Sequence, residues 1–387
     1  MAGARIVLGN NSLAKYPSGG GHWTWFLQIA LGLVDLGHDV IVLESLLSTG
    51  DEHEDRQRIK TFFDRMQQYG LRERCALLLY PKTLDVQEIE TAQEFGKSRS
   101  EILAAIRSAD VLWNLACSIR EPMLSRFNRR VLIDVDPGHL QISALTWEMD
   151  IGAHHALLSV GRKIHDPDCG VPTLGFKWQR FSPFVFLPMW QKEPDPGRDA
   201  PFSSVTHWTW EELSYEGRVV SVSKRSAYLR YVELPKRARR RFDLAAYIIA
   251  DDRTGDRELL ELNGWTLLDP RRVVATPQDY REFIRRSRAE IQCPKPAYRE
   301  LRTGWFSDRS ACYLASGRPV LAEATGFSEF LPTGAGLLSF TDMEEALAGV
   351  ADIDANYERH SRAARAIAEQ HLDSRHWLPK MLAASGL

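Results

Sequence analysis

Short apolar runs alternate with helical periodicity along most of this chain. The first two runs, at residues 5–9 and 39–44, are separated by a glycine-rich turn and by apolar positions at helical spacing over residues 23–36. Runs this short, bounded by glycine and polar turns, indicate buried strands. Two strands joined by a helix form a β-α-β unit with parallel strands and a right-handed crossover. The chain is therefore predicted to begin a parallel sheet.

This alternation continues through both halves of the chain. Further strands are expected at residues 111–115, 131–134, 204–208, 266–268, 289–293 and 319–323, and helices at residues 226–234 and 279–287. Proline, glycine and aromatic residues dominate residues 150–200, which we interpret as a connection and a wall between domains. From residue 357 onward the pattern is that of amphipathic helix.

The length of the chain sets the number of domains. A chain of 387 residues is too long for one ordinary core. We predict an α/β protein with two doubly wound, Rossmann-like domains, residues 1–190 and 191–360, followed by helix in residues 361–387. In such sheets ligands bind at the carboxyl edge of the strands.

Composition and charge limit the class of protein and the partners that we expect. Apolar residues make up 44% of the chain and charged residues 26%, as in soluble globular proteins, and the net charge of −2 points to neither a nucleic-acid nor a membrane partner. No apolar run approaches the ~18 residues of a transmembrane helix, and no signal-peptide pattern opens the sequence. Five cysteines occur without C-x-x-C spacing, which favours free thiols over zinc or disulfides. We expect a cytoplasmic protein without a metal or other bound cofactor.

The loop Gly19-Gly20-Gly21-His22 follows the first predicted strand. Glycines let the backbone approach a ligand closely. The loop lacks the Gly-x-Gly-x-x-Gly spacing of a dinucleotide site and the Gly-Lys-Ser/Thr of a Walker loop. Gly20 and Gly21 are therefore candidate ligand contacts outside those two classes.

Carboxylates and helix openings follow other predicted strands. Asp134 and Asp136 end a buried strand, and a metal motif, an active-site pair and a simple turn all remain open for them. Residues suited to helix N-termini come later in the chain: Ser307, Asp308, Thr325, Gly326 and Ser328. Two helix N-termini at one sheet edge suit a diphosphate, because each presents N–H groups to an anion.

The pattern F-S-x-R-x-x-x-Y-L-A-S-G-R-P-V-L, followed by T-G-F-S-E-F-L-P-T-G-A-G-L-L-S-F, resembles the C-terminal donor domain of GT-B glycosyltransferases. It is most similar to bacterial enzymes of glycosyltransferase families 4 and 1, specifically over residues 290–345. The resemblance implies two Rossmann-like domains facing each other across a cleft, with the last helix crossing back to the first domain. It also implies transfer of a sugar from a nucleotide-diphosphate sugar to a small-molecule or saccharide acceptor.

The resemblance also implies roles for single residues. His22 lies where inverting members carry the general base, and an imidazole suits that role because its pKa is near neutral. Charge builds on the leaving diphosphate, so a cation must face it, and the candidates are Arg309, Lys295 and Lys224. The forked guanidinium favours Arg309. Independently of the resemblance, Trp208 is the best candidate for ligand contact among eleven tryptophans, because it ends a predicted strand and is expected to face the cleft; core packing is the alternative.

The chain departs from the family pattern at one point. Retaining family-4 members carry two glutamates eight residues apart, and the alignment places Gly304 and Cys312 at those positions. Either Asp308 or Glu329 replaces them in donor binding, or the chain is not a retaining family-4 enzyme, and His22 favours inversion. A GT-B sugar-nucleotide epimerase and a non-catalytic GT-B binding protein stay open as alternatives.

Overall fold

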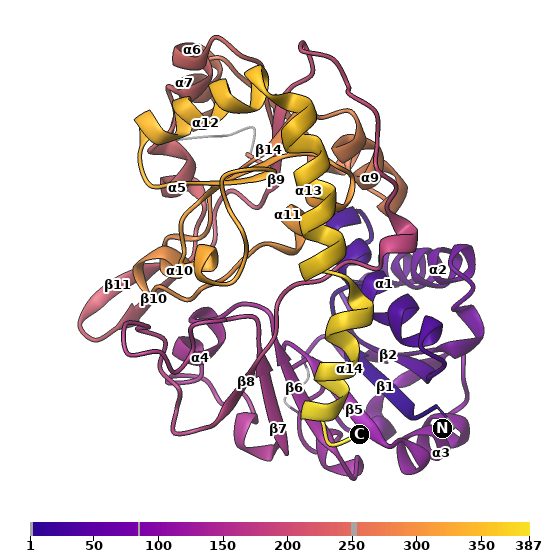
Figure 1. Ribbon diagram of the computed structural model, residues 1–387. Coiled ribbons are helices and arrows are strands. Elements are labelled where there is room, and N and C mark those ends of the chain that lie inside the picture. The colour runs from indigo at the N-terminus through magenta and orange to yellow at the C-terminus, as the bar shows by residue number, and fades with distance from the viewer. Residues whose placement is uncertain (1–2, 84–85, 249–253) are drawn as a thin grey trace.

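The computed structural model describes residues 3–83, 86–248 and 254–387. These residues form two lobes, each built on a sheet of mainly parallel strands (Figure 1). The first lobe lies at the bottom of Figure 1 in indigo to magenta, and the second lobe lies above it. The yellow C-terminal helices run from the second lobe down across the first.

In the described part of the chain, the sheet of the first lobe has the strand order β4-β3-β2-β1-β5-β6-β7-β8, and only the β3–β4 pair is antiparallel. Its strands are β1 (Arg5–Asn10), β2 (Asp39–Leu47), β3 (Cys75–Tyr80), β4 (Gln93–Phe95), β5 (Val111–Leu115), β6 (Arg130–Asp134), β7 (Ala156–Ser159) and β8 (Trp178–Arg180). Its helices are α1 (Gly20–Asp35), α2 (Glu52–Gln68), α3 (Arg99–Ser108) and α4 (His139–Ser143).

The second lobe has the order β13-β12-β9-β14-β15-β16 among its described strands, all parallel, and β10 and β11 form a separate hairpin. These strands are β9 (Phe202–Thr206), β10 (Glu212–Tyr215), β11 (Arg218–Ser221), β12 (Phe242–Ala246), β13 (Trp265–Leu268), β14 (Ala289–Gln292), β15 (Val320–Glu323) and β16 (Leu337–Phe340). The helices of this lobe are α5 (Arg225–Leu229), α6 (Leu234–Ala238), α7 (Asp256–Leu262), α8 (Pro270–Val273), α9 (Pro277–Arg285), α10 (Pro296–Glu300), α11 (Asp308–Ala315), α12 (Met343–Ala355) and α13 (Tyr357–His371). The last helix of the chain, α14 (Ser374–Ala384), packs on the first lobe.

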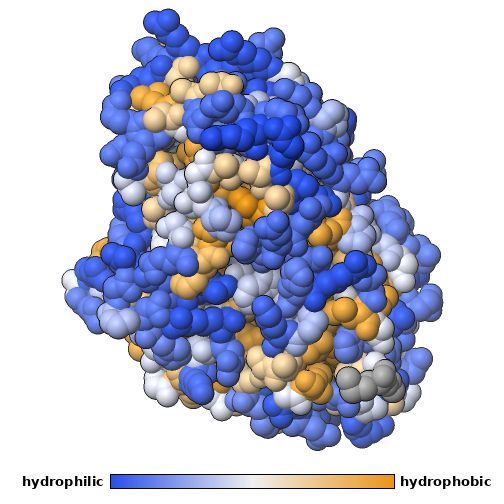
Figure 2. Space-filling view, in the orientation of Figure 1, coloured by the Kyte–Doolittle hydropathy of each residue, from blue (hydrophilic) through white to orange (hydrophobic). Residues whose placement is uncertain are grey.

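Strand β1 shows why the sequence forms sheets covered on both faces. Ile6 and Leu8 pack into one hydrophobic cluster with side chains of α1 and α2, while Val7 packs into the cluster on the other face with α3. Apolar residues at every position of a strand are typical of parallel sheets that helices cover on both sides. Hydrophilic residues cover most of the outer surface, and apolar residues gather nearer the middle of the view in Figure 2.

Both sheets start at a central strand, which fixes where a ligand site should lie. β1 lies between β2 and β5, and β9 lies between β12 and β14. The chain leaves each central strand first to one side and then to the other. Ligands of doubly wound sheets bind at such switch points, beyond the carboxyl ends of the strands. The predicted fold class of two doubly wound sheets is confirmed.

The C-terminal helices join the two lobes. α13 packs on α11 of the second lobe, and α14 packs on α1 of the first lobe. Leu378 and Met381 are buried in the core of the first lobe, and the indole nitrogen of Trp113 donates a hydrogen bond of 2.9 Å to Ser385 Oγ. The domain limits at residues 190 and 360 stay a prediction. None of the helices in the described ranges combines the length and the apolar content needed to cross a bilayer.

Two sequence expectations about secondary structure are wrong. Residues 150–200 are more than a connection, because β7 and β8 extend the first sheet. Both strands are short and lie among proline, glycine and aromatic residues, which hide a strand pattern. The helix expected at residues 226–234 is instead two short helices, α5 and α6, with Pro235 in the first turn of the second.

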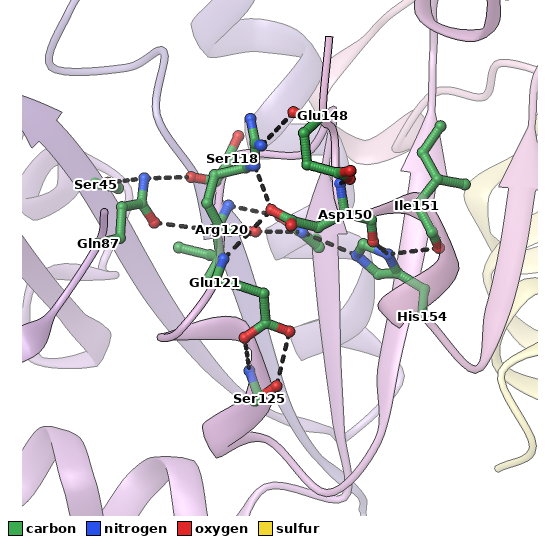
Figure 3. A network of polar contacts seen from close by, with 12 residues as sticks. Ser45, Gln87, Ser118, Arg120, Glu121, Ser125, Glu148, Asp150, Ile151 and His154 are labelled. Carbon is green, nitrogen blue, oxygen red and sulfur yellow. Dashed lines mark hydrogen bonds and ion pairs between the residues drawn. The ribbon is translucent and has the colours of Figure 1, made fainter. Parts of the chain in front are cut away.

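A polar network fastens the loop that follows β5 (Figure 3). The Arg120 guanidinium forms an ion pair with Asp150, and the Arg120 backbone N–H donates to Gln87 Oε1 at 2.9 Å. The amide nitrogen of Gln87 donates to Ser45 Oγ and to the Ser118 carbonyl, both at 3.2 Å. These bonds join β2, the loop after β5 and the turn before β7, so the irregular loops of the first lobe are held by defined contacts.

Candidate active site

The start of α1 lies against the second lobe. The backbone N–H of Gly20 donates to the Val274 carbonyl at 3.0 Å, and a Cβ on Gly20 would lie 2.4 Å from that oxygen. Gly21 packs against the Tyr280 ring of α9. The close approach that these glycines permit is therefore to the other lobe. This corrects the expectation that the glycine loop opens toward a ligand.

Replacing Gly20 with alanine is expected to destabilise the protein by about 1–3 kcal/mol, because the new methyl group overlaps two backbone carbonyl oxygens that cannot rotate away. Gly21→Ala is the matched control, since its methyl group meets Tyr280 at an ordinary contact distance of 3.4 Å and alanine favours helix. Urea denaturation of both variants measures the difference. Equal stability of the two variants would contradict the proposed packing.

His22 lies in the first turn of α1, close to charged groups of the second lobe. Its ring stacks on Tyr16, with centroids 5.2 Å apart and planes 19° apart. Burial by the surrounding protein lowers the pKa of His22, although part of the residue reaches solvent. The charge of Asp308 raises this pKa, and His207 lowers it further. Asp308 and His207 belong to the second lobe, so this histidine of the first lobe faces the second across the cleft. A neutral imidazole there is able to accept a proton.

Helix α11 begins at the opposite wall of the cleft. Ser307 is its N-cap, and its Oγ accepts the backbone N–H of Arg309 at 3.2 Å, as its residue type predicts. The helix that was expected to begin after Gly326 is only a 3-10 turn, Phe327–Glu329. Of the two helix N-termini expected after Ser307 and after Gly326, the structure therefore forms only the first.

Arg309 is fixed at the switch point of the second sheet. Its Nε donates to Glu290 Oε1 of β14 at 2.5 Å, and its Nη1 donates to the Val205 carbonyl of β9 at 2.6 Å. Its Nη2 is buried without a hydrogen-bond partner among the described residues. The sequence predicts an Arg309 guanidinium that is free to bind phosphate through two nitrogens. This expectation is wrong, because Glu290 and Val205 already accept hydrogen bonds from two of its nitrogens. A single N–H₂ group is left for a ligand.

Two lysines add positive charge beside Arg309. Lys224 lies before α5, with its Nζ 5.9 Å from the centroid of the Trp305 ring. Burial, together with the charges of Arg309 and Lys295, lowers the pKa of Lys224 to about 7. Lys295 lies directly before α10, past the end of β14. The three predicted cations therefore lie together at the carboxyl edge of the second sheet.

Asp136 links the two lobes within the cleft. Its carboxylate forms an ion pair with Lys295 and accepts a hydrogen bond from the Tyr298 hydroxyl. His139 contacts it at 3.1 Å and contacts Glu211 at 2.8 Å on its other side. Burial opposes ionisation of Asp136, but Lys295 and His139 outweigh it and hold its pKa below the usual range. Asp136 therefore acts as a fixed anion that positions Lys295.

Asp134 lies deeper, with no exposed surface. It accepts hydrogen bonds from Ser159 Oγ at 2.6 Å and from Gln141 Nε2 at 2.9 Å, and burial raises its pKa. An epimerase of this fold would need free paired carboxylates around the sugar. Asp134 and Asp136 are both engaged, so the structure gives the epimerase alternative no support.

Several other predicted residues have different surroundings. Trp208 is buried at 2% exposure, and its indole nitrogen donates to Asp256 at 2.9 Å, so the expectation that it faces the cleft is wrong. Thr325 is buried and donates through its hydroxyl to the Trp305 carbonyl. Gly326 has a φ of +96°, which favours glycine, and Ser328 is exposed.

Gly304, where family members carry a glutamate, lies under a lysine of the first lobe. A Cβ on Gly304 would lie 2.7 Å from Lys163 Cγ, and one on Gly326 would lie 2.8 Å from Lys163 Cδ. The Lys163 ammonium pairs with Glu329 at 2.5 Å and with Asp168 at 2.9 Å. Lys163 thus fills the space of the missing side chain, and Glu329 is held in a contact between the lobes.

Cys312, at the second glutamate position, also lies between the lobes. Its sulfur is 3.7 Å from the amide nitrogen of Gln28 in α1, and the residue is 1% exposed.

Sequence reasoning missed several residues that shape the site: Tyr16, His139, Lys163, His207, Glu290 and Tyr298. Only two of them carried a signal, since His139 follows the Asp-x-Asp turn and Tyr298 lies one helical turn after Lys295.

Comparison with known proteins gives a partial match to a family model and a fold. Residues 230–383 match the family model described as "Glycosyl transferase-like". No curated protein sequence matches the chain. Among solved structures, an alpha-glucosyltransferase in complex with UDP and DNA is similar with a TM-score of 0.62 and 12% identity, and 100% of each chain is covered.

Two further solved structures have the same architecture. HepE of Anabaena, in complex with UDP and glucose, has a TM-score of 0.57 and 12% identity, with 98% of each chain covered. Sucrose-phosphate synthase of Thermosynechococcus elongatus has a TM-score of 0.55 and 10% identity, with 97% of each chain covered. The predicted resemblance to GT-B glycosyltransferases is confirmed, and the fold is GT-B.

One expectation about partners is overturned by these comparisons. The small net charge predicts no nucleic-acid partner, yet the alpha-glucosyltransferase structures of this fold hold DNA together with UDP or UDP-glucose. A net charge sums over the whole surface and does not report a local basic patch. Nucleic acid is therefore not excluded as a partner.

Proposed function

We propose that this protein is a glycosyltransferase that takes its sugar from a nucleotide-diphosphate sugar, with UDP as the donor nucleotide. The observation that carries the proposal is the pairing of His22 on the first lobe with a cluster of three cations, Lys224, Lys295 and Arg309, on the second. Both groups lie at the carboxyl edges of doubly wound sheets. UDP in the solved structures of similar fold supports the choice of nucleotide.

The donor diphosphate is proposed to bind before α11. Backbone N–H groups at the helix start, capped by Ser307, and the unpartnered Nη2 of Arg309 face the phosphate oxygens. Lys224 and Lys295 supply further charge to offset the negative charge that develops on the leaving diphosphate. These side chains provide the cationic role without a metal ion, so we expect EDTA to leave the transfer rate unchanged.

His22 is proposed to act as the general base. The acceptor hydroxyl oxygen forms a bond to the sugar C1 while the C1–oxygen bond to the diphosphate breaks, and UDP leaves with that electron pair. The hydroxyl proton passes to the His22 imidazole. A base on the lobe opposite the diphosphate favours attack from the face opposite the leaving group, and therefore inversion at C1.

The acceptor is proposed to be a hydroxyl-bearing small molecule or saccharide bound over the first lobe. The decisive first experiment is calorimetry with UDP, GDP and dTDP. Binding of UDP in the micromolar range supports the proposal, and absence of binding by all three nucleotides would contradict it. A panel of acceptors, with a DNA duplex among them, then identifies the class that receives the sugar from UDP-glucose.

Donor affinity is expected to fall as pH rises through 7. Burial sets the pKa of Lys224 to about 7, and a bound diphosphate favours its charged form. Binding is therefore strongest below that pKa and weakens above it, by about tenfold between pH 6.5 and 8.5. Calorimetry with UDP-glucose, whose diphosphate does not titrate in this range, measures the effect.

The Lys224→Met variant is the control for this pH dependence. Its affinity for UDP-glucose is expected to be low and flat across the same range, because the titrating ammonium is gone. A wild-type affinity that does not change with pH, or a variant that retains the full dependence, would remove Lys224 from the donor site.

A further inference from the structure

A second hollow lies away from the cation cluster, at the junction of the lobes with the C-terminal helices. It has a volume of about 650 Å³. The first lobe contributes Arg162 and Ser182, the second lobe contributes Phe330 and Leu331, and α13 and α14 supply the remaining wall. Because all three parts line it, a ligand that fills the pocket contacts both lobes and the C-terminal helices.

The lining of this junction pocket is strongly basic. Its charged and titratable residues are Arg162, His371, Arg375, His376 and Lys380, with no carboxylate among the lining residues. Arg375 is paired with Asp35 at 3.0 Å. Across the described residues no ion pair forms at Arg162 or Lys380. Positive charge inside the pocket is therefore only partly compensated.

Arg162 is half-buried, whereas Arg375 and Lys380 are exposed. The Nη1 of Arg162 donates to Ser182 Oγ at 2.6 Å, while its Nε is buried without a hydrogen-bond partner among the described residues. Burial lowers the pKa of Arg162, and the charge of Arg180 adds to the lowering. A half-buried guanidinium without a carboxylate partner has lost part of its hydration without compensation. Binding an anion compensates for that loss.

Aromatic rings fix the direction of the cations. The Arg162 guanidinium carbon lies 4.6 Å from the centroid of Phe330 and 5.2 Å from that of Trp377, and Lys380 Nζ lies 4.8 Å from Trp377. Cation–π contacts hold a guanidinium by its face and leave its N–H groups free at the edge. Those N–H groups match the oxygens of a phosphate.

We propose that the junction pocket binds a phosphate-bearing small molecule, with Arg162 and Lys380 as the phosphate ligands. The volume exceeds that of a phosphate group and falls in the range of small-molecule sites, so it has room for the molecule that carries the phosphate. This site is separate from the donor site and does not depend on the proposed function. Its ligand bridges the first lobe, the second lobe and α14.

The test is calorimetry with inorganic phosphate as the probe, on the full chain saturated with UDP so that the donor site is filled. We expect the affinity for phosphate to fall at least tenfold in the variant Arg162→Gln/Lys380→Gln, while UDP binding is unchanged. The matched control is Arg237→Gln/Lys60→Gln, which removes two surface cations that pair with Glu344 and Asp64.

Unchanged UDP affinity and unfolding temperature show that the variant is folded. Equal phosphate affinity in wild type and variant, or no phosphate binding to wild type, overturns the proposal. If the double variant loses binding of a short DNA strand but keeps its affinity for phosphate, the pocket is a nucleic-acid site and the proposal is overturned. If no protein binds UDP, the proposed function fails, while the phosphate comparison is run without UDP and still decides this inference.

Discussion

Replacing His22 with alanine is expected to lower kcat by a factor of about 10²–10⁴, while the affinity for UDP stays within about threefold. His22 lies on the first lobe and the cations that bind the diphosphate lie on the second, so the substitution removes the base without touching the donor site. Initial rates with UDP-glucose and the identified acceptor give kcat, and calorimetry gives the UDP affinity.

The control for this variant is His53→Ala, an exposed histidine at the start of α2, which should leave both quantities unchanged. The wild-type enzyme should lose activity on acidification, since the pKa of His22 is lowered from 6.5 and only the neutral imidazole accepts a proton. A large loss of UDP affinity in His22→Ala would instead make this residue part of the donor site.

The Glu290→Met variant is expected to lose about 3–5 kcal/mol of unfolding free energy, because it leaves the Arg309 guanidinium buried without its carboxylate. Chemical denaturation measures the loss. The double variant Glu290→Met/Arg309→Met should recover most of the stability, since removing both charges also removes the desolvation cost. Binding of UDP should stay weak in the double variant, because the free Nη2 is gone.

The comparison variant is Glu344→Met, which removes the partner of Arg237 in an exposed pair. Surface pairs of this kind contribute about 0–1 kcal/mol, so the effect should be small. If Glu290→Met is as mild as Glu344→Met, Arg309 finds other partners and is not a fixed element of the site. A double variant with normal UDP affinity would exclude Arg309 from donor binding.

The sequence was informative where a local pattern decides the structure. The β-α-β start, the Ser307 cap and the cation positions follow from short-range rules on strand length, capping and strand ends. It was uninformative for β7 and β8, because these short strands lie among proline, glycine and aromatic residues that hide a strand pattern. Tertiary pairing, and not local propensity, determines those elements.

Side-chain partners across the chain could not be predicted in the same way. Arg309 was expected to offer its whole fork, but Glu290 and Val205, which engage it, lie 19 and 104 residues away. Trp208 was placed at the cleft because it follows a strand, yet its indole reaches inward to Asp256. A strand end fixes which edge a residue occupies, while its direction depends on partners that no local rule identifies.

The packing of α14 has a consequence for how the protein is made. Leu378, Met381 and Leu382 belong to the core of the first lobe. Ser385 accepts a hydrogen bond from the indole nitrogen of Trp113 in β5. A ribosome releases these residues only after the whole second lobe has been synthesised. The lobe that begins first is thus completed last, and a nascent chain halted before residue 374 carries an exposed apolar face for chaperones to shield.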